Sequence, residues 1–220
     1  MKQIIDFLSE LTINNNRDWF NANKPKYLEV RELFENFVDE IILNLQENDP
    51  SLKGLTAKKS VFRIYRDVRF SGDKSPYKTN FGAYMVGGGR KSGRSGFYIH
   101  LDPAESFIGG GLYQPEPQRL KAIRQEIFGY PDEFLAVLQK PEFSDSYNLY
   151  EKDKLKRPPK GYPADFEHVD LLKYKHYIAS KIIPDEWIGK DNLLEKIVKE
   201  FRILCPLSEY LNRAMESESN

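Results

Sequence analysis

The middle of this chain combines strand-like alternation with most of its glycine, and this limits the fold more than any other feature. Apolar and polar residues alternate over residues 62–70 and 97–102, and residues 81–86 and 107–113 resemble two further strands. Ten of the 14 glycines fall between Gly72 and Gly111, which is typical of tight turns, bulges and close backbone approach. Because the connections are short, we expect an antiparallel sheet over about residues 60–113.

The regions on both sides have the three- and four-residue apolar spacing of amphipathic helices. We predict helices over residues 3–11, 27–45, about 115–128, 132–138, 171–180 and 192–205, with Cys205 in the core. A proline-rich loop interrupts the second helical region over residues 140–165, and residues 216–220 are expected to fray.

The predicted fold is therefore α+β and forms a single domain over residues 1–220. N-terminal helices occupy residues 1–50, the sheet follows, and C-terminal helices over residues 115–213 pack on one of its faces. No stretch approaches the ~18 uninterrupted apolar residues of a membrane span, so we expect no membrane association. The single cysteine excludes an internal disulfide and a Cys-x-x-Cys metal site, so we expect a cytoplasmic protein and no metal.

Charge is distributed unevenly, although 33 basic and 33 acidic residues give a net charge of zero. Residues 56–94 carry a net +8, because only Asp67 and Asp73 oppose ten cations. The ten are Lys58, Lys59, Arg63, Arg66, Arg69, Lys74, Lys78, Arg90, Lys91 and Arg94. This local excess favours an anionic partner, whereas zero overall charge argues against broad coating of nucleic acid. The alternative is that these cations pair with acids of the flanking helices.

Residues 62–78 hold the densest group of candidate ligand-binding side chains. In a strand, Arg63, Tyr65, Asp67 and Arg69 would share one side, and Tyr98, His100 and Asp102 of a paired strand would join them. Guanidinium groups suit recognition of phosphate or carboxylate, and a turn over residues 71–75 offers free backbone N–H groups. The candidate ligand-binding residues are Arg63, Tyr65, Arg66, Arg69, Asp73, Lys74, Tyr77, Lys78 and Arg157.

Candidates for catalysis are few. His100 with Asp102 could act as a base and its orienting acid or as two metal ligands, although a hydrogen-bonded structural histidine is the commoner case. Asp67 is a further candidate, but neighbouring arginines favour its ionised, salt-bridged form. His168 and His176 are interpreted as surface histidines, and no nucleophile motif is present. The cofactor is not defined by any motif.

Two basic loops have open interpretations. Residues 87–96, with Arg90, Lys91 and Arg94, form a solvated hairpin loop or close over an anionic ligand. Residues 152–162 contain Arg157 and Pro158-Pro159, which stiffen the chain toward polyproline II geometry. This second loop is a lid over the sheet, a partner-binding segment or a solvated connection.

Three segments resemble a known family. They are Asn16-Arg17-Asp18-Trp19-Phe20 with Asn23, Lys24 and Tyr27; residues 62–67 through Ser71, Asp73, Lys74 and 76–78; and residues 156–162. Together they resemble a bacterial and fungal family of conserved hypothetical proteins, domain-of-unknown-function family 2461, over about residues 4–211. The resemblance implies one intracellular domain of about this length, and it implies no activity and no catalytic residue.

Two functions follow as hypotheses. The first is binding, with or without turnover, of a phosphorylated or other anionic small molecule on the polar face of the sheet, where Arg63, Tyr65, Arg69 and His100 would converge in a concave site. The alternative is a binding module without enzymatic activity, whose flat basic surface and exposed aromatic residues meet nucleic acid or an acidic protein. The zero net charge and the glycine-rich turns favour the first.

Overall fold

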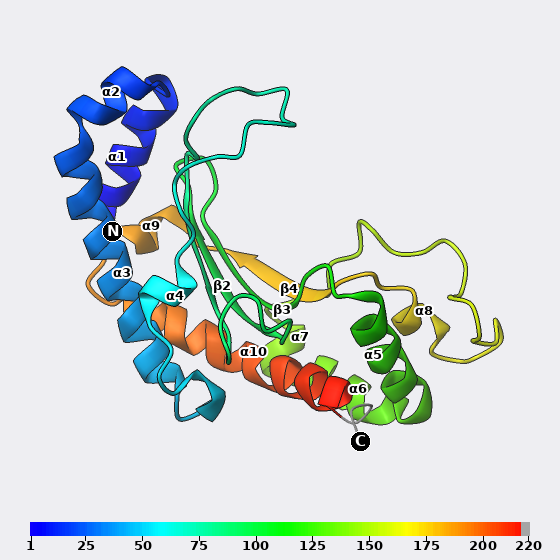
Figure 1. Cartoon of the computed structure of the whole chain (residues 1–220). Helices are drawn as coiled ribbons and strands as arrows, with labels where there is room; N and C mark the ends of the chain where they lie inside the picture. Colours follow the sequence, from blue (N-terminus) through cyan, green and yellow to red (C-terminus); the bar gives the residue numbers. More distant parts are fainter. Residues whose placement is uncertain (217–220) are drawn as a thin grey trace.

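The centre of the protein is a four-stranded antiparallel sheet with strand order β1-β2-β3-β4, seen in a computed structural model that describes residues 1–216 (Figure 1). The strands are β1 (Phe81–Met85), β2 (Gly96–Leu101), β3 (Phe107–Leu112) and β4 (Tyr177–Ile182). The first three strands follow one another in the chain and are joined by short connections, which suits antiparallel pairing. β4 joins the sheet only after a long, mainly helical region.

The strand register divides the sheet into a buried face and an open face. Phe97 pairs with Met85 on one side and with Gly110 on the other, so these residues share a face. That buried face consists mainly of apolar side chains: Phe81, Ala83, Met85, Phe97, Ile99, Leu101, Ile108, Tyr177 and Ala179. The open face carries Tyr84, Tyr98, His100, Phe107, Ile178, Ser180 and Ile182, which are all intermediate or exposed.

Helices precede β1, separate β3 from β4 and follow β4, which agrees with the α+β prediction. The N-terminal elements are α1 (Lys2–Ile13), α2 (Arg17–Ala22), α3 (Lys24–Leu45), a 3-10 turn η1 (Pro50–Leu52) and α4 (Ala57–Ser60). The later elements are α5 (Pro117–Gly129), α6 (Pro131–Leu138), α7 (Pro141–Ser144), α8 (Val169–Leu172), α9 (Asp185–Ile188) and α10 (Leu193–Glu216). None of the helices in residues 1–216 has the length and apolar content needed to cross a membrane.

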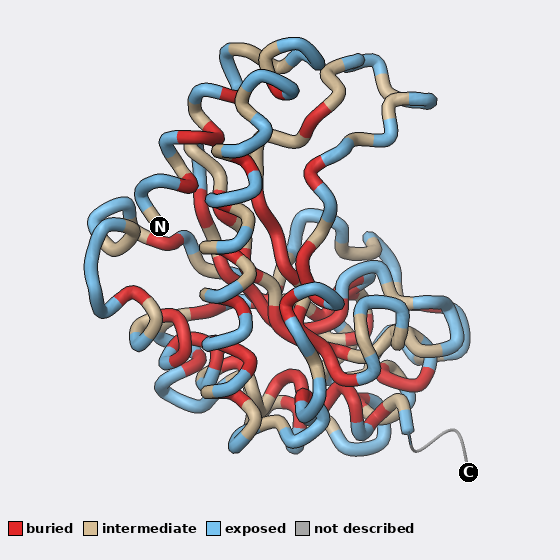
Figure 2. Tube along the Cα trace, turned by 60° about the vertical axis from the view of Figure 1, so that its left-hand side comes forward, coloured by how far each residue is buried: buried red, intermediate tan, exposed pale blue. Residues whose placement is uncertain are grey.

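Helix α10 covers the buried face, crossing β3 and β2 (Figure 1). Phe201 meets Phe97 edge to face with ring centroids 5.5 Å apart, and a Cβ at Gly110 would lie only 3.1 Å from Leu204. Glycine on β3 therefore lets this long helix approach the sheet closely. Buried residues follow the zone where sheet and helices meet, whereas the outlying loops are largely exposed (Figure 2).

The predicted strand over residues 62–70 is wrong. Residues 61–80, which we call the projecting segment, form only two isolated β-bridges. One joins Val61 to Ala83 of β1, and the other joins Tyr65 to Tyr77 within the segment. Two aspartate side chains take backbone N–H groups that pairing in a strand would use. Asp67 accepts a hydrogen bond from the N–H of Arg69, and Asp73 accepts one from the N–H of Ser75. The segment consequently extends beyond the end of the sheet as a loop (Figure 1).

The helix predicted over residues 171–180 is also wrong, because α8 ends at Leu172 and β4 occupies most of the remainder. β4 pairs with the glycine-rich β3 along its length, so long-range pairing overrides the local helical spacing. The final helix is longer than predicted, continuing through Pro206 to Glu216. The predicted frayed tail lies mostly outside the described residues, since only Glu216 is described and it is helical.

Two further assignments need comment. His176 is buried and is not a surface histidine, because it lies at the start of β4 beneath the segment that follows β3. Cys205 is partly buried against the core, and burial raises the pKa of its thiol to about 12.

Candidate functional site

An aromatic band crosses the open face near the end of the sheet from which the projecting segment leaves. The band consists of Phe62, Tyr98, His100 and Phe107. The rings of His100 and Phe107, which are register partners on β2 and β3, stack at 4.7 Å and 19°. The Tyr98 ring lies 5.7 Å from that of Phe107 and 6.3 Å from that of Phe62. The four rings, all partly exposed, therefore form a row that runs from the start of the projecting segment across β2 to β3.

Phe62 joins the band because its backbone N–H donates to the carbonyl of Gly82, at 2.9 Å. This bond accompanies the isolated bridge between Val61 and Ala83, which pairs the start of the projecting segment with the outer edge of β1. The absence of a side chain at Gly82 also matters, because a Cβ there would lie 2.5 Å from the Tyr98 hydroxyl oxygen. The bare backbone of Gly82 therefore provides the space in which the Tyr98 ring bridges toward Phe62.

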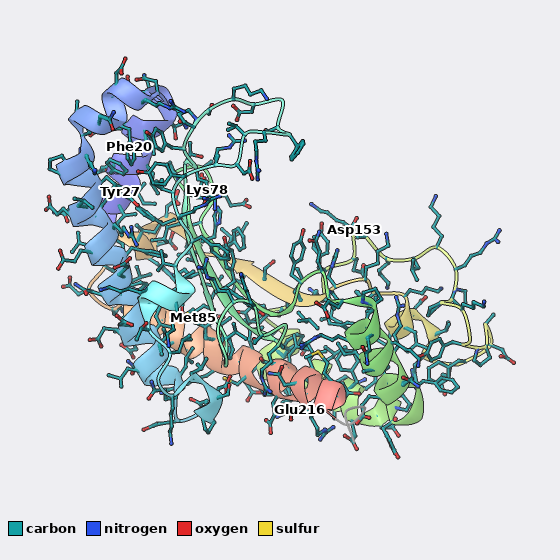
Figure 3. The ribbon with its side chains drawn as sticks, viewed as in Figure 1. Phe20, Tyr27, Lys78, Met85, Asp153 and Glu216 are labelled. Carbon is teal, nitrogen blue, oxygen red and sulfur yellow. The ribbon has the colours of Figure 1, made fainter. Side chains whose placement is uncertain are left out.

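Two cations lie over the Phe62 ring, and the charge of a third, Arg63, acts on one of them; we call Arg63, Lys78 and Arg90 the cation corner. Lys78 Nζ lies 5.4 Å and Arg90 Cζ 4.7 Å from the centroid of Phe62. Burial lowers the pKa of Lys78, and the charges of Arg63 and Arg90 lower it further, so all three cations are within electrostatic reach. Figure 3 shows Lys78 where the projecting segment meets the strands.

The positive charge of this corner is poorly compensated. Within residues 1–216, neither Arg63 nor Lys78 makes a hydrogen bond or salt bridge to a carboxylate, and Arg90 Nε donates to the carbonyl of Lys59. Asp67 is within electrostatic reach of Arg63, but hydrogen bonds from Arg69 already engage it. An anion placed at the corner would relieve the mutual repulsion that lowers the pKa of Lys78.

His100 connects the cation corner to the aromatic band. Its Nδ1 lies 2.9 Å from the Tyr98 hydroxyl, and its Nε2 lies 4.0 Å from Asp102 Oδ2, which is beyond hydrogen-bond range. Burial lowers the pKa of His100, opposed by Asp102 and Glu105 and supported by the charge of Lys78. Burial also raises the pKa of Tyr98 to about 12, so its hydroxyl stays protonated. At neutral pH the site therefore presents a neutral imidazole beside a lysine.

Most of the other predicted ligand-binding residues lie elsewhere. At the loop tip, residues 66–75, Arg66 pairs with Asp73 and Arg69 pairs with Asp67, with an Arg69 Nη2 to Asp67 Oδ2 distance of 2.6 Å. Lys74 Nζ donates to the carbonyl of Val68 at 3.0 Å. Hydrogen bonds from Ser75, and then Arg66, lower the pKa of Asp73 to about 2. The loop-tip arginines therefore pair with the two aspartates of the same loop and not with acids of the flanking helices, and these carboxylates stay ionised.

The two candidate tyrosines of the projecting segment face the N-terminal helices. Tyr77 is buried and stacks on Phe20 of α2 at 3.9 Å and 15°, and Asn15 bonds both its backbone N–H and its carbonyl. Tyr65 is 47% exposed, and its ring lies 6.0 Å from that of Phe20. Tyr65 and Tyr77 therefore anchor the projecting segment, and no described contact joins them to His100.

The basic loop around Arg157 lies beside α5 and α8. The N–H of Tyr150 donates to Ile178 and the N–H of Leu155 donates to Lys173, which attaches the loop near the start of β4. Arg157 itself is exposed. Figure 3 shows Asp153 of this loop on the other side of the molecule from Lys78. In this arrangement the loop does not cover the cation corner.

Surface hollows occur at other places. One of about 390 Å³ is lined by residues that include Arg94 and Arg119, and another of about 500 Å³ lies between α1 and α3. Neither is lined by Lys78 or His100. Among residues 1–216, no group of three His, Cys, Asp or Glu side chains is arranged to hold a metal ion.

Sequence reasoning missed three residues of this arrangement. Phe62 was expected on the buried side of a strand, Phe107 in a weakly indicated one, and Arg90 in a separate hairpin loop. Their association depends on the pairing of Phe62 with Gly82 and on the side chain of Arg90 reaching back across the sheet edge. The glycine at position 82 was the one local signal of close approach.

Comparison with known proteins gives a family and no activity. A family model described as "Conserved hypothetical protein (DUF2461)" matches residues 3–210. No curated protein and no solved structure matches the chain. The matched region includes the aromatic band, the cation corner and most of α10. Since the match extends over nearly the whole length, the chain belongs to the conserved hypothetical protein family DUF2461.

Proposed function

We propose that this protein binds an anionic small molecule at the cation corner, with His100 as a neighbouring contact. The observation that carries the proposal is the poorly compensated charge: Lys78 and Arg90 both lie over the Phe62 ring. Burial lowers the pKa of Lys78, and the charges of Arg63 and Arg90 lower it further. A phosphate or carboxylate group would provide the missing counter-charge and accept charge-assisted hydrogen bonds. The free Cys205 thiol is compatible with the reducing cytoplasm, where we place this binding.

This proposal narrows the set of ligand-binding residues. Arg63 and Lys78 remain, Arg90 joins them, and His100 changes from a catalytic candidate to a ligand contact. Its Nε2, 4.0 Å from Asp102, makes no hydrogen bond within residues 1–216 and is available to an anion. Arg66, Arg69, Asp73 and Lys74 are assigned to the internal structure of the loop tip.

The test compares two cations of the projecting segment. Thermal unfolding is measured with inorganic phosphate, sulfate, sugar phosphates and dicarboxylates, first on the unmodified protein and then on Lys78→Met and Arg69→Met. We expect at least one anion to raise the Tm of the unmodified protein and of Arg69→Met. We expect Lys78→Met to lose about tenfold or more in affinity, since a charge-assisted hydrogen bond contributes about 1.5–3 kcal/mol.

The ligand-free variants give a second readout. Because Lys78 is a partly buried cation without a carboxylate partner, its replacement by an apolar side chain of similar length should leave the Tm unchanged or raise it. Loss of anion binding without loss of stability is the signature of a binding residue. If no anion in the set stabilises the protein, or if Lys78→Met responds like the unmodified protein, the proposal is wrong.

A further inference from the structure

The Tyr98 and Phe107 rings of the aromatic band have no role in holding a simple anion, yet they lie directly beside the cation corner. Phe62, Tyr98, His100 and Phe107 are all partly exposed, and Ile182, the register partner of Phe107 on β4, is 58% exposed. Ser180, one step along the same face, is also exposed. Apolar and aromatic surface is thus continuous with the charged corner across β2, β3 and β4.

We propose, building on the anion site above, that the ligand is a nucleoside phosphate. Its phosphate lies at the cation corner beside His100, and its base packs against Phe107 and Ile182. Three cations suit a dianionic phosphate better than a single carboxylate. A planar base stacks on aromatic side chains, whatever its identity, because each base has a π-face. A sugar phosphate or an inorganic anion would leave this apolar surface exposed to water.

The dimensions of the sheet agree with this assignment. Lys78 Nζ lies 5.4 Å from the centroid of the Phe62 ring, which is 6.3 Å from that of Tyr98 on β2, so an anion bound by Lys78 lies beside β2. Phe107 lies on β3 and Ile182 on β4, and neighbouring strands are about 4.8 Å apart. The phosphate and the base are therefore separated by one to two strand spacings, or about 5–10 Å, which a ribose can span.

The far end of the same face argues for a free nucleotide and against a nucleic-acid strand. A second aromatic cluster lies there, with the ring of Tyr113 at 4.8 Å from that of His176. Asp153 occupies that end, with its Oδ2 at 3.3 Å from His176 Nε2. A strand crossing the face would bring its phosphates toward this carboxylate, and like charges repel. On this face the cation corner lies at the end that holds Lys78.

The test separates the base from the phosphate. Affinities of inorganic phosphate, ribose 5-phosphate, AMP, UMP and an eight-residue oligothymidine are measured by calorimetry. The proteins are the unmodified chain, Phe107→Leu, which keeps an apolar side chain but removes the ring, and Tyr113→Leu as the matched control at the other aromatic cluster. Ile182→Ser is the second variant if Phe107→Leu does not fold, as judged by circular dichroism.

We expect AMP and UMP to bind at least tenfold more tightly than ribose 5-phosphate to the unmodified protein. Phe107→Leu or Ile182→Ser should reduce this advantage to about threefold or less and leave the affinity for ribose 5-phosphate unchanged. Tyr113→Leu should change neither affinity.

Each failure has its own pattern. Ribose 5-phosphate binding as tightly as AMP overturns the nucleotide assignment and leaves the anion site intact. Absence of binding by all phosphate compounds overturns the anion site itself. Oligothymidine binding that exceeds AMP binding tenfold, and that Tyr113→Leu weakens, would show a strand-binding surface and overturn the free-nucleotide assignment.

Discussion

Two basic regions of the same segment differ in how their charge is compensated. At the loop tip, Arg66 and Arg69 each pair with an aspartate a few residues away. At the cation corner, Arg63 and Lys78 converge with Arg90 from a different loop, and no carboxylate pairs with either of the first two within residues 1–216. A local charge excess in a sequence therefore does not locate free charge. Cations with an acidic partner nearby in the sequence are neutralised by it, whereas those brought together by the fold keep their charge.

The largest expected effect comes from removing each pair of cations in turn. Arg63→Met/Lys78→Met should weaken binding of the best anion by about 100-fold or more, because two charge-assisted contacts are lost. Arg66→Met/Arg69→Met should change the same affinity by no more than about twofold, since these side chains are engaged at the loop tip. The affinity of both double variants for this anion is measured by calorimetric titration. Equal losses in the two would remove the distinction between the regions.

Two glycines, one beside the aromatic band and one at the loop tip, allow the same two regions to be compared through backbone substitutions. Gly82→Ala should push the Tyr98 hydroxyl away from His100, because the new Cβ would lie 2.5 Å from it. Loss of the Tyr98–His100 hydrogen bond should lower the free energy of unfolding by about 1 kcal/mol. Gly72→Ala at the loop tip meets no atom within 4 Å and should leave stability unchanged or raise it by up to about 1 kcal/mol. Urea unfolding measures both.

That outcome would be contradicted by a Gly82→Ala variant with unchanged stability and unchanged anion affinity. The Tyr98 ring would then have another position of equal energy, and the aromatic band would not depend on the bare backbone of β1. Crystal structures of the two variants provide the control.

Much of the fold follows from local patterns, and the exceptions have physical reasons. Apolar spacing predicts the helices on both sides and the strands β1, β2 and β3. It fails at Asp67 and Asp73, whose side chains take backbone N–H groups that a strand would use. It also fails at Tyr177, because β4 is defined by pairing with distant glycines and no local pattern records a partner.

The candidate site is recoverable from the sequence only in part. Arg63, Lys78 and His100 stand out as polar groups next to strands, and whether they bind a ligand stays a prediction. Phe62 and Phe107 resemble ordinary core residues, because their position on the open face depends on which face α10 covers. Arg90 belongs to the site through a side chain that crosses to another segment. Sequence spacing carries no information about that contact.

A smaller effect is expected from pH, through His100. Its pKa is lowered in the ligand-free protein, mainly by burial and also by Lys78, while Asp102 and Glu105 oppose the shift. A bound anion near Nε2 would stabilise the imidazolium and raise that pKa, so the complex takes up a proton. Sulfate, which does not titrate in this range, should therefore bind about threefold to tenfold more tightly as the pH falls from about 7.5 to about 5.5.

The ligand-free protein should show the opposite trend. Because the folded pKa of His100 lies below its unfolded value near 6.5, the unfolded state binds more protons, and the contribution of this residue to stability falls as the pH drops through that range. His100→Gln should remove both pH dependences while Tyr98, Lys78, Asp102 and Glu105 remain. A sulfate affinity that is unaffected by pH in the unmodified protein would exclude His100 as a ligand contact.

The smallest effect tests whether the aspartates are what prevent the loop tip from binding anions. In the Arg63→Met/Lys78→Met background, we expect Asp67→Asn/Asp73→Asn to create a weak affinity for inorganic phosphate at Arg66 and Arg69, because their counter-charges are gone. Arginine Nε–H resonances followed by NMR should shift on titration with phosphate, and the shift should disappear at about 0.5 M salt, since exposed charges are screened. If these resonances do not respond to phosphate, pairing with aspartate is not the reason for the difference, and the geometry of the corner must be.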